Sequence, residues 1–89
     1  MYVTEHGIAD AQDTQREWYI QESLRFLQQA ISEGADVRGY THWSLLDNFE
    51  WAFGYTHKFG LFAVDRESSK RVPRPSARMY GEIAKNNCL

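Results

Sequence analysis

Cysteine is almost absent from this chain. The single cysteine, Cys88, lies one residue before the C-terminal Leu89. One cysteine excludes an internal disulfide and makes a thiolate-rich metal site implausible. It favours a reducing, cytoplasmic location, an expectation that a leader lost from a truncated N terminus would change.

The chain also lacks an excess of positive charge and a long apolar run. Ten Lys and Arg stand against twelve Asp and Glu, and the charges are dispersed along the sequence. Nucleic-acid backbones require a basic stripe, so nucleic acid is a poor candidate partner. No stretch approaches the ~20 apolar residues that span a bilayer, and residues 1–5 do not read as a leader, so we expect no membrane association.

What the chain does have is hydrophobic and aromatic content. Hydrophobic residues make up 43% and aromatic residues 15% of the 89 residues. That composition argues against a disordered chain. A domain of this size removes only about 60% of its unfolded surface from water, so it needs a self-contained layered architecture to fold alone.

The N-terminal half reads as a strand followed by a helix. Residues 2–4 are β-prone and lead into a loop. Thr14 and Glu17 have capping-box spacing and predict a helix over residues 14–33, with Gly34 as its C-terminal stop. The apolar face of this helix consists of Ile20, Leu24, Leu27 and Ile31.

A second strand and a long connection follow. Residues 37–43 are β-branched and aromatic and come shortly after the helix, which is the rhythm of a parallel βαβ unit. Residues 44–58 form a long, aromatic-rich connection. Loops of this length without regular structure are uncommon unless they have a function.

The C-terminal part predicts a second helix. Residues 59–65 favour a short extended piece, residues 66–71 a charged turn, and Pro73 marks a boundary before a helix over residues 76–85. The order is that of two successive βα units. Two parallel strands cannot cover their faces and edges, whereas eight such units close into a barrel of roughly 250 residues.

Four segments carry a specific resemblance. Residues 2–10 resemble the Y-[IV]-T-E-N-G-I-A-D segment of glycoside hydrolase family 1 β-glycosidases, and residues 38–55 resemble that family's R-G-Y-x-x-W-S-L-x-D-N-[FY]-E-W-x-x-G-[YF] block. Residues 59–65 match its F-G-L-x-x-V-D, and residues 70–77 echo its K-R-x-P-K-x-S-A. The resemblance implies an α/β fold: strands seven and eight, with their helices, of a (β/α)₈ TIM barrel, with residues 1–89 forming an incomplete part of one domain.

The resemblance also implies roles for five side chains. Glu5 would end strand seven and act as the catalytic nucleophile. Trp43, before a non-proline cis peptide at the end of strand eight, would form the floor of the glycone pocket. Glu50 would accept the sugar's 4- and 6-hydroxyls, Trp51 would donate to the 3-hydroxyl, and Phe59 would close the wall near the 6-position. Flat apolar surfaces alternating with hydroxyl-binding groups suit a pyranose.

His6 departs from the family pattern, which has asparagine here. An imidazole can donate or accept, but it is bulkier than the amide. We expect it to lie behind the site, with effects on local geometry and on the pH optimum.

The other residues of the long connection are expected to be structural. Asp47 and Asn48 should brace the loop through backbone hydrogen bonds. His42 and His57 belong to different elements and have no accompanying carboxylate, so no metal is assigned, and no cofactor either. Four aromatic side chains should pack over the barrel end: Phe49, Phe53, Tyr55 and Phe62.

The resulting expectation is a retaining β-glycosidase similar to β-glucosidase. The Glu50 carboxylate would repel a sugar phosphate, which favours unphosphorylated β-D-glycosides. Retaining hydrolysis needs a second carboxyl group about 5–5.5 Å from the nucleophile. The family carries that acid/base glutamate in an N-E-P motif upstream of the matched segments, so this chain alone should be nearly inactive and should need the N-terminal remainder of the barrel.

Two alternatives stay open. The chain could be a non-catalytic carbohydrate-binding fragment in which Trp43 and Trp51 form a platform, or an inactive barrel fragment that self-associates through its strand edges. The sequence leaves open the sugar, the aglycone, the oligomeric state and the natural extent of the chain.

Overall fold

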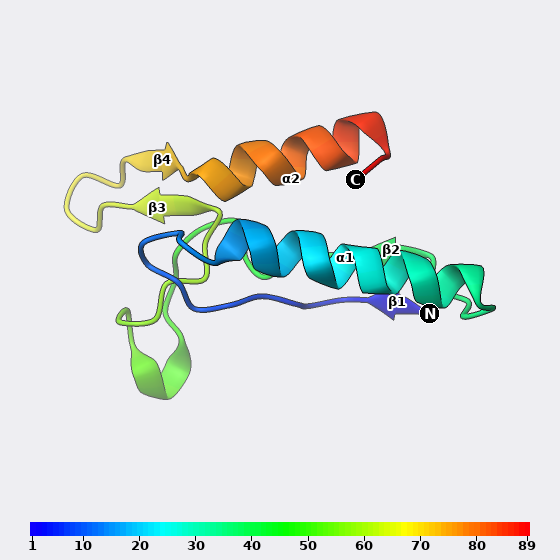
Figure 1. Ribbon diagram of the computed structural model, residues 1–89. Helices are drawn as coiled ribbons and strands as arrows, with labels where there is room; N and C mark the ends of the chain where they lie inside the picture. Colours follow the sequence, from blue (N-terminus) through cyan, green and yellow to red (C-terminus); the bar gives the residue numbers. More distant parts are fainter.

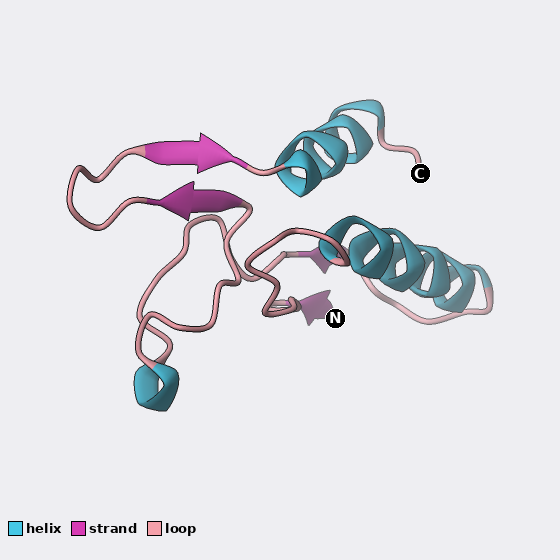
Figure 2. Cartoon of the chain, turned by 60° about the vertical axis from the view of Figure 1, so that its left-hand side comes forward, coloured by secondary structure: helices cyan, strands magenta, loops and turns pink.

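The computed structural model describes residues 1–89 as two neighbouring helices, a short two-stranded parallel sheet beside the first of them, and a separate two-stranded hairpin that leads into the second (Figures 1 and 2). The helices run side by side in the same direction, and a loop projects away from both. The elements in chain order are β1 (Tyr2–Val3), α1 (Arg16–Ser32), β2 (Gly39–Tyr40), the 3₁₀ turn η1 (Trp51–Phe53), β3 (Phe62–Val64), β4 (Arg71–Pro73) and α2 (Pro75–Asn86).

The predicted βαβ unit is confirmed. β1 and β2 pair in parallel, with Tyr2 opposite Gly39 and Val3 opposite Tyr40, and α1 connects them. Both strands are shorter than expected. Beyond the regular pairs, single backbone bonds link the two segments, such as the one from the Trp43 N–H to the His6 carbonyl at 2.9 Å.

The predicted capping box of α1 is wrong, and the helix begins two residues later than predicted. The N-cap residue is Gln15, whose side chain makes no cap hydrogen bond, so Thr14 and Glu17 form no capping box. Instead, Oδ2 of Asp10 accepts the N–H groups of Gln15 at 2.7 Å and Arg16 at 3.1 Å. This carboxylate satisfies the donors that a capping threonine would have taken, so the helix begins at Arg16.

The charged turn expected over residues 66–71 is present, but it joins the two strands of a second small sheet, and its last residue, Arg71, belongs to β4. β3 and β4 pair antiparallel, with Ala63 opposite Val72, and β4 was not predicted. Arg71 and Pro73 favoured the interpretation of this segment as a turn, because charge and proline are typical of turns as well as of edge strands. α2 follows at once, close to its predicted span.

Little of the chain is buried. Nine of 89 residues are buried, and only Ile20 and Leu61 among them are hydrophobic. The accessible surface is 6354 Å², against ~5,400 Å² for a folded monomer of 10.4 kDa. The radius of gyration is 14.0 Å, against about 12 Å for a compact domain of this length. The chain is an open slab without a core of its own.

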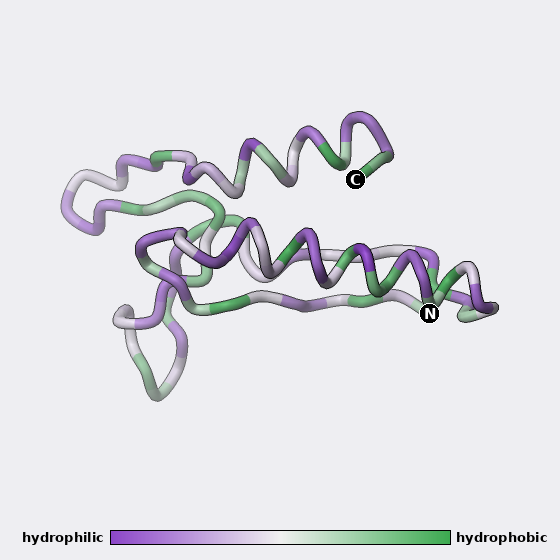
Figure 3. The backbone as a smooth tube through the Cα atoms, in the orientation of Figure 1, coloured by the Kyte–Doolittle hydropathy of each residue, from purple (hydrophilic) through white to green (hydrophobic).

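The apolar positions of both helices alternate with polar ones along the backbone (Figure 3). Neither helix is long and apolar enough to cross a membrane.

Candidate functional site

Trp43 lies where β2, the end of the β1 segment and the loop before β3 converge. Its N–H donates to the His6 carbonyl, and the Ser44 N–H donates to the Phe59 carbonyl at 3.2 Å. The peptide between Trp43 and Ser44 is cis, as the family resemblance implied. A Cβ built on Gly7 would lie 1.9 Å from the Trp43 carbonyl oxygen, so only glycine allows the two segments to approach this closely.

Trp43 and Glu50 are brought together. The indole Nε1–H of Trp43 donates to Oε1 of Glu50 at 3.0 Å. The Glu50 N–H in turn donates to the Gly54 carbonyl at 2.7 Å, which closes the tip of the loop. The Trp43 ring and the Glu50 carboxylate therefore lie side by side at the surface.

The other predicted site residues flank this pair. Trp51 opens η1 with a φ of 48° and is 87% exposed, so its indole is free of the rest of the chain. Phe59 is half-buried beside Ser44. Glu5 is exposed and immediately precedes His6, whose carbonyl binds Trp43. All five predicted residues thus belong to segments that meet near Trp43.

The loop between β2 and β3 is braced through Asp47, as predicted. Asp47 is buried; its Oδ1 accepts the Gly60 N–H at 3.0 Å, and both carboxylate oxygens accept from Arg74 at 2.8 and 2.9 Å. Burial acts to raise the pKa of Asp47, but the bonds from Arg74 and Gly60 outweigh it and hold that pKa below its ordinary value. Asn48 also braces the loop, by donating to the Leu46 carbonyl at 3.2 Å.

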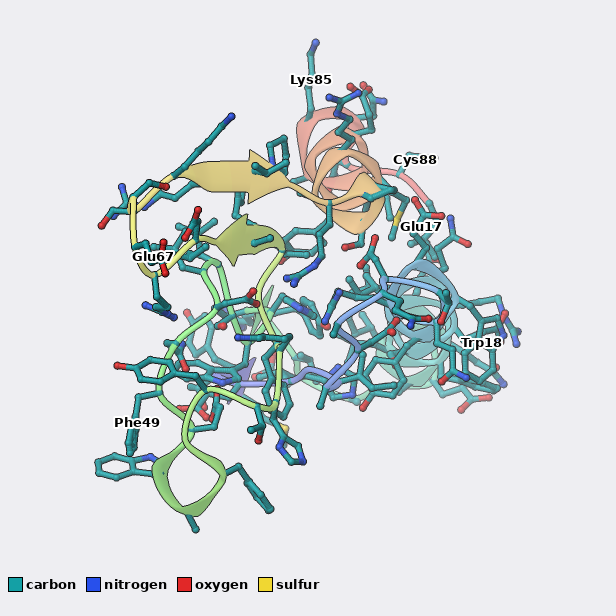
Figure 4. The ribbon with its side chains drawn as sticks, turned by 90° about the vertical axis from the view of Figure 1, so that its left-hand side faces the viewer. Glu17, Trp18, Phe49, Glu67, Lys85 and Cys88 are labelled. Carbon is teal, nitrogen blue, oxygen red and sulfur yellow. The ribbon has the colours of Figure 1, made fainter.

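The aromatic side chains of the loop pack on one another. Phe49 contacts Tyr55 edge-on at 5.5 Å between ring centroids, and Phe53 lies over His57 at 4.1 Å. Phe49 nevertheless projects from the molecule and is 51% exposed (Figure 4). Phe62 lies in β3, outside this cluster, and is half-buried. The expected packing of these four side chains over a barrel end stays a prediction.

No group of three or more His, Cys, Asp or Glu residues has the arrangement of a metal site. His42 and His57 belong to separate segments, and His42 lies beside the Tyr80 ring of α2 at 5.9 Å.

The protein family described as glycosyl hydrolase family 1 matches residues 1–89, the whole chain. The chain belongs to glycosyl hydrolase family 1. Its matched structures are β-glycosidases with the TIM-barrel fold, and this chain corresponds to one part of such a barrel.

Three family members illustrate the similarity. The β-galactosidase of Saccharolobus solfataricus is 52% identical over 89 residues, which cover 100% of this chain and 18% of that protein. The β-glucosidase of Pyrococcus furiosus superposes with a TM-score of 0.98 at 50% identity, covering 100% of this chain and 19% of that one. The β-glucosidase of Thermotoga maritima in complex with glucoimidazole gives 0.90 at 38% identity, covering 99% and 22%. The chain thus spans about a fifth of the length of these family 1 proteins.

One feature of this family 1 chain was missed at the sequence level, namely the surroundings of His6. Its Nδ1 lies 3.0 Å from the Tyr40 hydroxyl, and its Nε2 lies 3.0 Å from the Tyr19 hydroxyl. Burial first, and then the neighbouring Tyr80 and Tyr19, raise the pKa of Tyr40 to about 12. Helical periodicity places Tyr19 to one side of the apolar face of α1, and no sequence signal indicates its partner.

Proposed function

We propose that this chain supplies the nucleophile and part of the glycone subsite of a retaining β-glycosidase acting on terminal, unphosphorylated β-D-glycosides. The observation that carries the proposal is the Trp43–Glu50 pair, which lies against the segment bearing Glu5 in a chain that matches the family throughout. Relatives named β-glucosidase and β-galactosidase, one of them bound to glucoimidazole, support a glycosidic substrate.

Glu5 is the proposed nucleophile. Its exposed carboxylate attacks the anomeric carbon, the glycosidic C–O bond breaks, and the departing oxygen takes a proton from a second carboxylic acid about 5–5.5 Å away. Water then cleaves the glycosyl–enzyme ester, and the configuration of the anomeric carbon is retained. In this proposal the second carboxyl group, which protonates the leaving oxygen and then activates the water, belongs to a part of the barrel outside residues 1–89.

Trp43 and Glu50 hold the glycone. The Trp43 indole N–H fixes the orientation of the Glu50 carboxylate. The second oxygen of this carboxylate and its remaining lone pairs accept hydrogen bonds from the sugar hydroxyls. The face of Trp43 takes the apolar C–H side of the ring. Trp51 offers an exposed N–H donor, and Phe59 closes the wall. A 6-phosphate would be repelled by Glu50.

The proposed partner is the remainder of a (β/α)₈ barrel, with β1 and β2 as strands seven and eight. A two-stranded parallel sheet leaves both outer edges without hydrogen-bond partners, and closure into a barrel removes such edges. The open shape and the near absence of a hydrophobic core support this assignment.

A chimaeric barrel tests the proposal. Here this chain replaces the matching fifth of the Pyrococcus furiosus β-glucosidase, and turnover of an aryl β-glucoside is measured. The chimaeric barrel should hydrolyse the glucoside, Glu5→Gln should lower kcat on the order of 10³-fold or more, and the isolated chain should be nearly inactive.

A matched substitution controls for loss of charge. Glu67→Gln alters an exposed glutamate in the β3–β4 turn (Figure 4) and should leave kcat unchanged. Strong turnover by the isolated chain, or by the Glu5→Gln chimaera, contradicts the proposal.

Self-association of the isolated chain is the second candidate, because its sheet edges are free and Trp18 and Phe26 are 64% and 59% exposed. Light scattering combined with tryptophan fluorescence distinguishes self-association from sugar binding by the isolated chain. Large assemblies without a sugar response favour self-association, whereas a fluorescence change with sugar that survives Glu5→Gln favours a fragment that only binds.

A further inference from the structure

The His6 side chain joins three elements. It follows the β1 segment, its Nε2 lies 3.0 Å from the Tyr19 hydroxyl on α1, and its Nδ1 lies 3.0 Å from the Tyr40 hydroxyl on β2. The His6 and Tyr19 rings are nearly parallel, with centroids 4.8 Å apart. The imidazole therefore fastens the end of one strand both to the helical layer and to the neighbouring strand.

The His6 backbone contacts Trp43. Its carbonyl accepts the Trp43 N–H at 2.9 Å, and the next residue, Gly7, approaches the Trp43 carbonyl too closely for any side chain. One residue thus ties Trp43 and the two tyrosines together.

Glu5 lies one residue before this anchor. Successive side chains of an extended segment point to opposite sides, so a side chain fixed in the helical layer at position 6 directs position 5 to the other side. The exposure of Glu5 and the partial burial of His6 agree with that alternation.

We propose that His6 is a positioning residue: clamped between Tyr19 and Tyr40, it fixes the spacing between the Glu5 carboxylate and the Trp43 ring. This inference rests on the proposed function. The two nitrogens of the imidazole lie on opposite sides of a rigid ring, and each can donate or accept, so each holds one tyrosine hydroxyl. Tyr40 keeps its proton at neutral pH and stays available for either role.

The test uses the chimaeric barrel and an aryl β-glucoside. His6→Ala should lower kcat about tenfold or more with KM changed less than threefold, because a misplacement of about 1 Å can cost 10²-fold in rate. His6→Asn, which restores a donor and an acceptor on a shorter side chain, should recover most of kcat. Tyr19→Phe and Tyr40→Phe should each lower kcat several-fold.

Tyr80→Phe is the matched control. Tyr80 contacts the Tyr40 ring edge-on at 6.2 Å but makes no bond to His6, so kcat should not change. If His6→Ala does not fold, the kcat of Tyr40→Phe tests the inference instead, because this substitution removes a single oxygen atom and should leave the fold intact.

The inference is overturned if His6→Ala, or Tyr40→Phe in its place, lowers the unfolding midpoint while kcat stays at the unmodified value. Failure of the proposed function looks different: the unmodified chimaera would show no turnover, or Glu5→Gln would retain it.

Discussion

At the scale of single residues, two buried ion pairs hold together segments that lie far apart in the sequence. Arg16 is fully buried; it bonds Asp13 and donates to the carbonyls of Ile8 and Lys58. Asp13 also accepts the N–H of Ser76 at 2.9 Å and its hydroxyl at 2.7 Å, which caps the first turn of α2. The second pair joins Asp47 to Arg74.

Removing Arg74 should be strongly destabilising. Arg74→Met leaves the buried Asp47 charge without its partner, and breaking such pairs costs about 3–5 kcal/mol. Denaturant midpoints of the chimaeric barrel measure this. Arg25→Met breaks the exposed pair with Glu22 and should leave the midpoint nearly unchanged. Equal midpoints for both variants would mean that Arg74 contributes nothing to the attachment of the hairpin.

His42 should make stability depend on pH. Both of its ring nitrogens are buried without hydrogen-bond partners. Burial first, then the nearby Arg16 guanidinium and His6 ring, lower its pKa from 6.5 to about 4, against smaller opposite effects of the Phe59 backbone and Asp13. Between about pH 4 and 6.5, His42 therefore binds a proton in the unfolded chain but not in the folded chain.

The stability contributed by neutral His42 is present above pH 6.5 and is lost as the pH falls towards 4, by up to about 3 kcal/mol. His42→Phe should flatten this part of the pH dependence of the denaturant midpoint. Identical slopes for the two proteins between pH 4 and 6.5 would contradict the prediction.

At the scale of elements, two glycines in different settings should respond oppositely to alanine. A Cβ on Gly60 would lie 2.3 Å from the Asp47 backbone nitrogen, so Gly60→Ala must move the strand that leads into β3, at a cost of about 1–3 kcal/mol. Gly81 lies within α2 with nothing within 4 Å of its Cβ position, so Gly81→Ala should stabilise by about 0.5–1 kcal/mol. Thermal unfolding of the chimaeric barrel measures both; a shift in the same direction would be inconsistent with these contacts.

The elements that the sequence predicted are those whose signals are local. Apolar periodicity located α1 and α2, and Gly34, with a φ of 109°, follows the end of α1 as expected. β4 and the cap of α1 were missed because both depend on partners elsewhere. Val72 is paired by β3, and the helix entry is satisfied by Asp10 rather than by its own Thr14.

In the candidate site too, features with local sequence signals were predicted, whereas features that depend on distant contacts were missed. The motif segments placed Trp43, Glu50 and Phe59 in one loop system, and the structure brings these segments together. His6 contacts Tyr19, which is 13 positions away in the sequence, and Tyr40, which is 34 positions away. No periodicity in a single sequence encodes such pairs.

At the scale of the whole molecule, the central physical fact is the missing core. The chain has only two buried hydrophobic residues, and both outer edges of its parallel sheet are unpaired, so few internal contacts hold it rigid. Under the proposed function, the position of Glu5 relative to Trp43 would therefore depend on the remainder of the barrel.

The most direct measurement is the location of a trapped glycosyl group. A 2-deoxy-2-fluoro glucoside with a good leaving group slows hydrolysis of the covalent intermediate of a retaining enzyme, so the label accumulates on the nucleophile. Digestion of the treated chimaeric barrel and mass spectrometry should find the fluoroglucosyl group on the peptide containing Glu5, and Glu5→Gln should abolish it. A label on another carboxylate, or turnover of ordinary aryl glucoside without any label, would contradict the account.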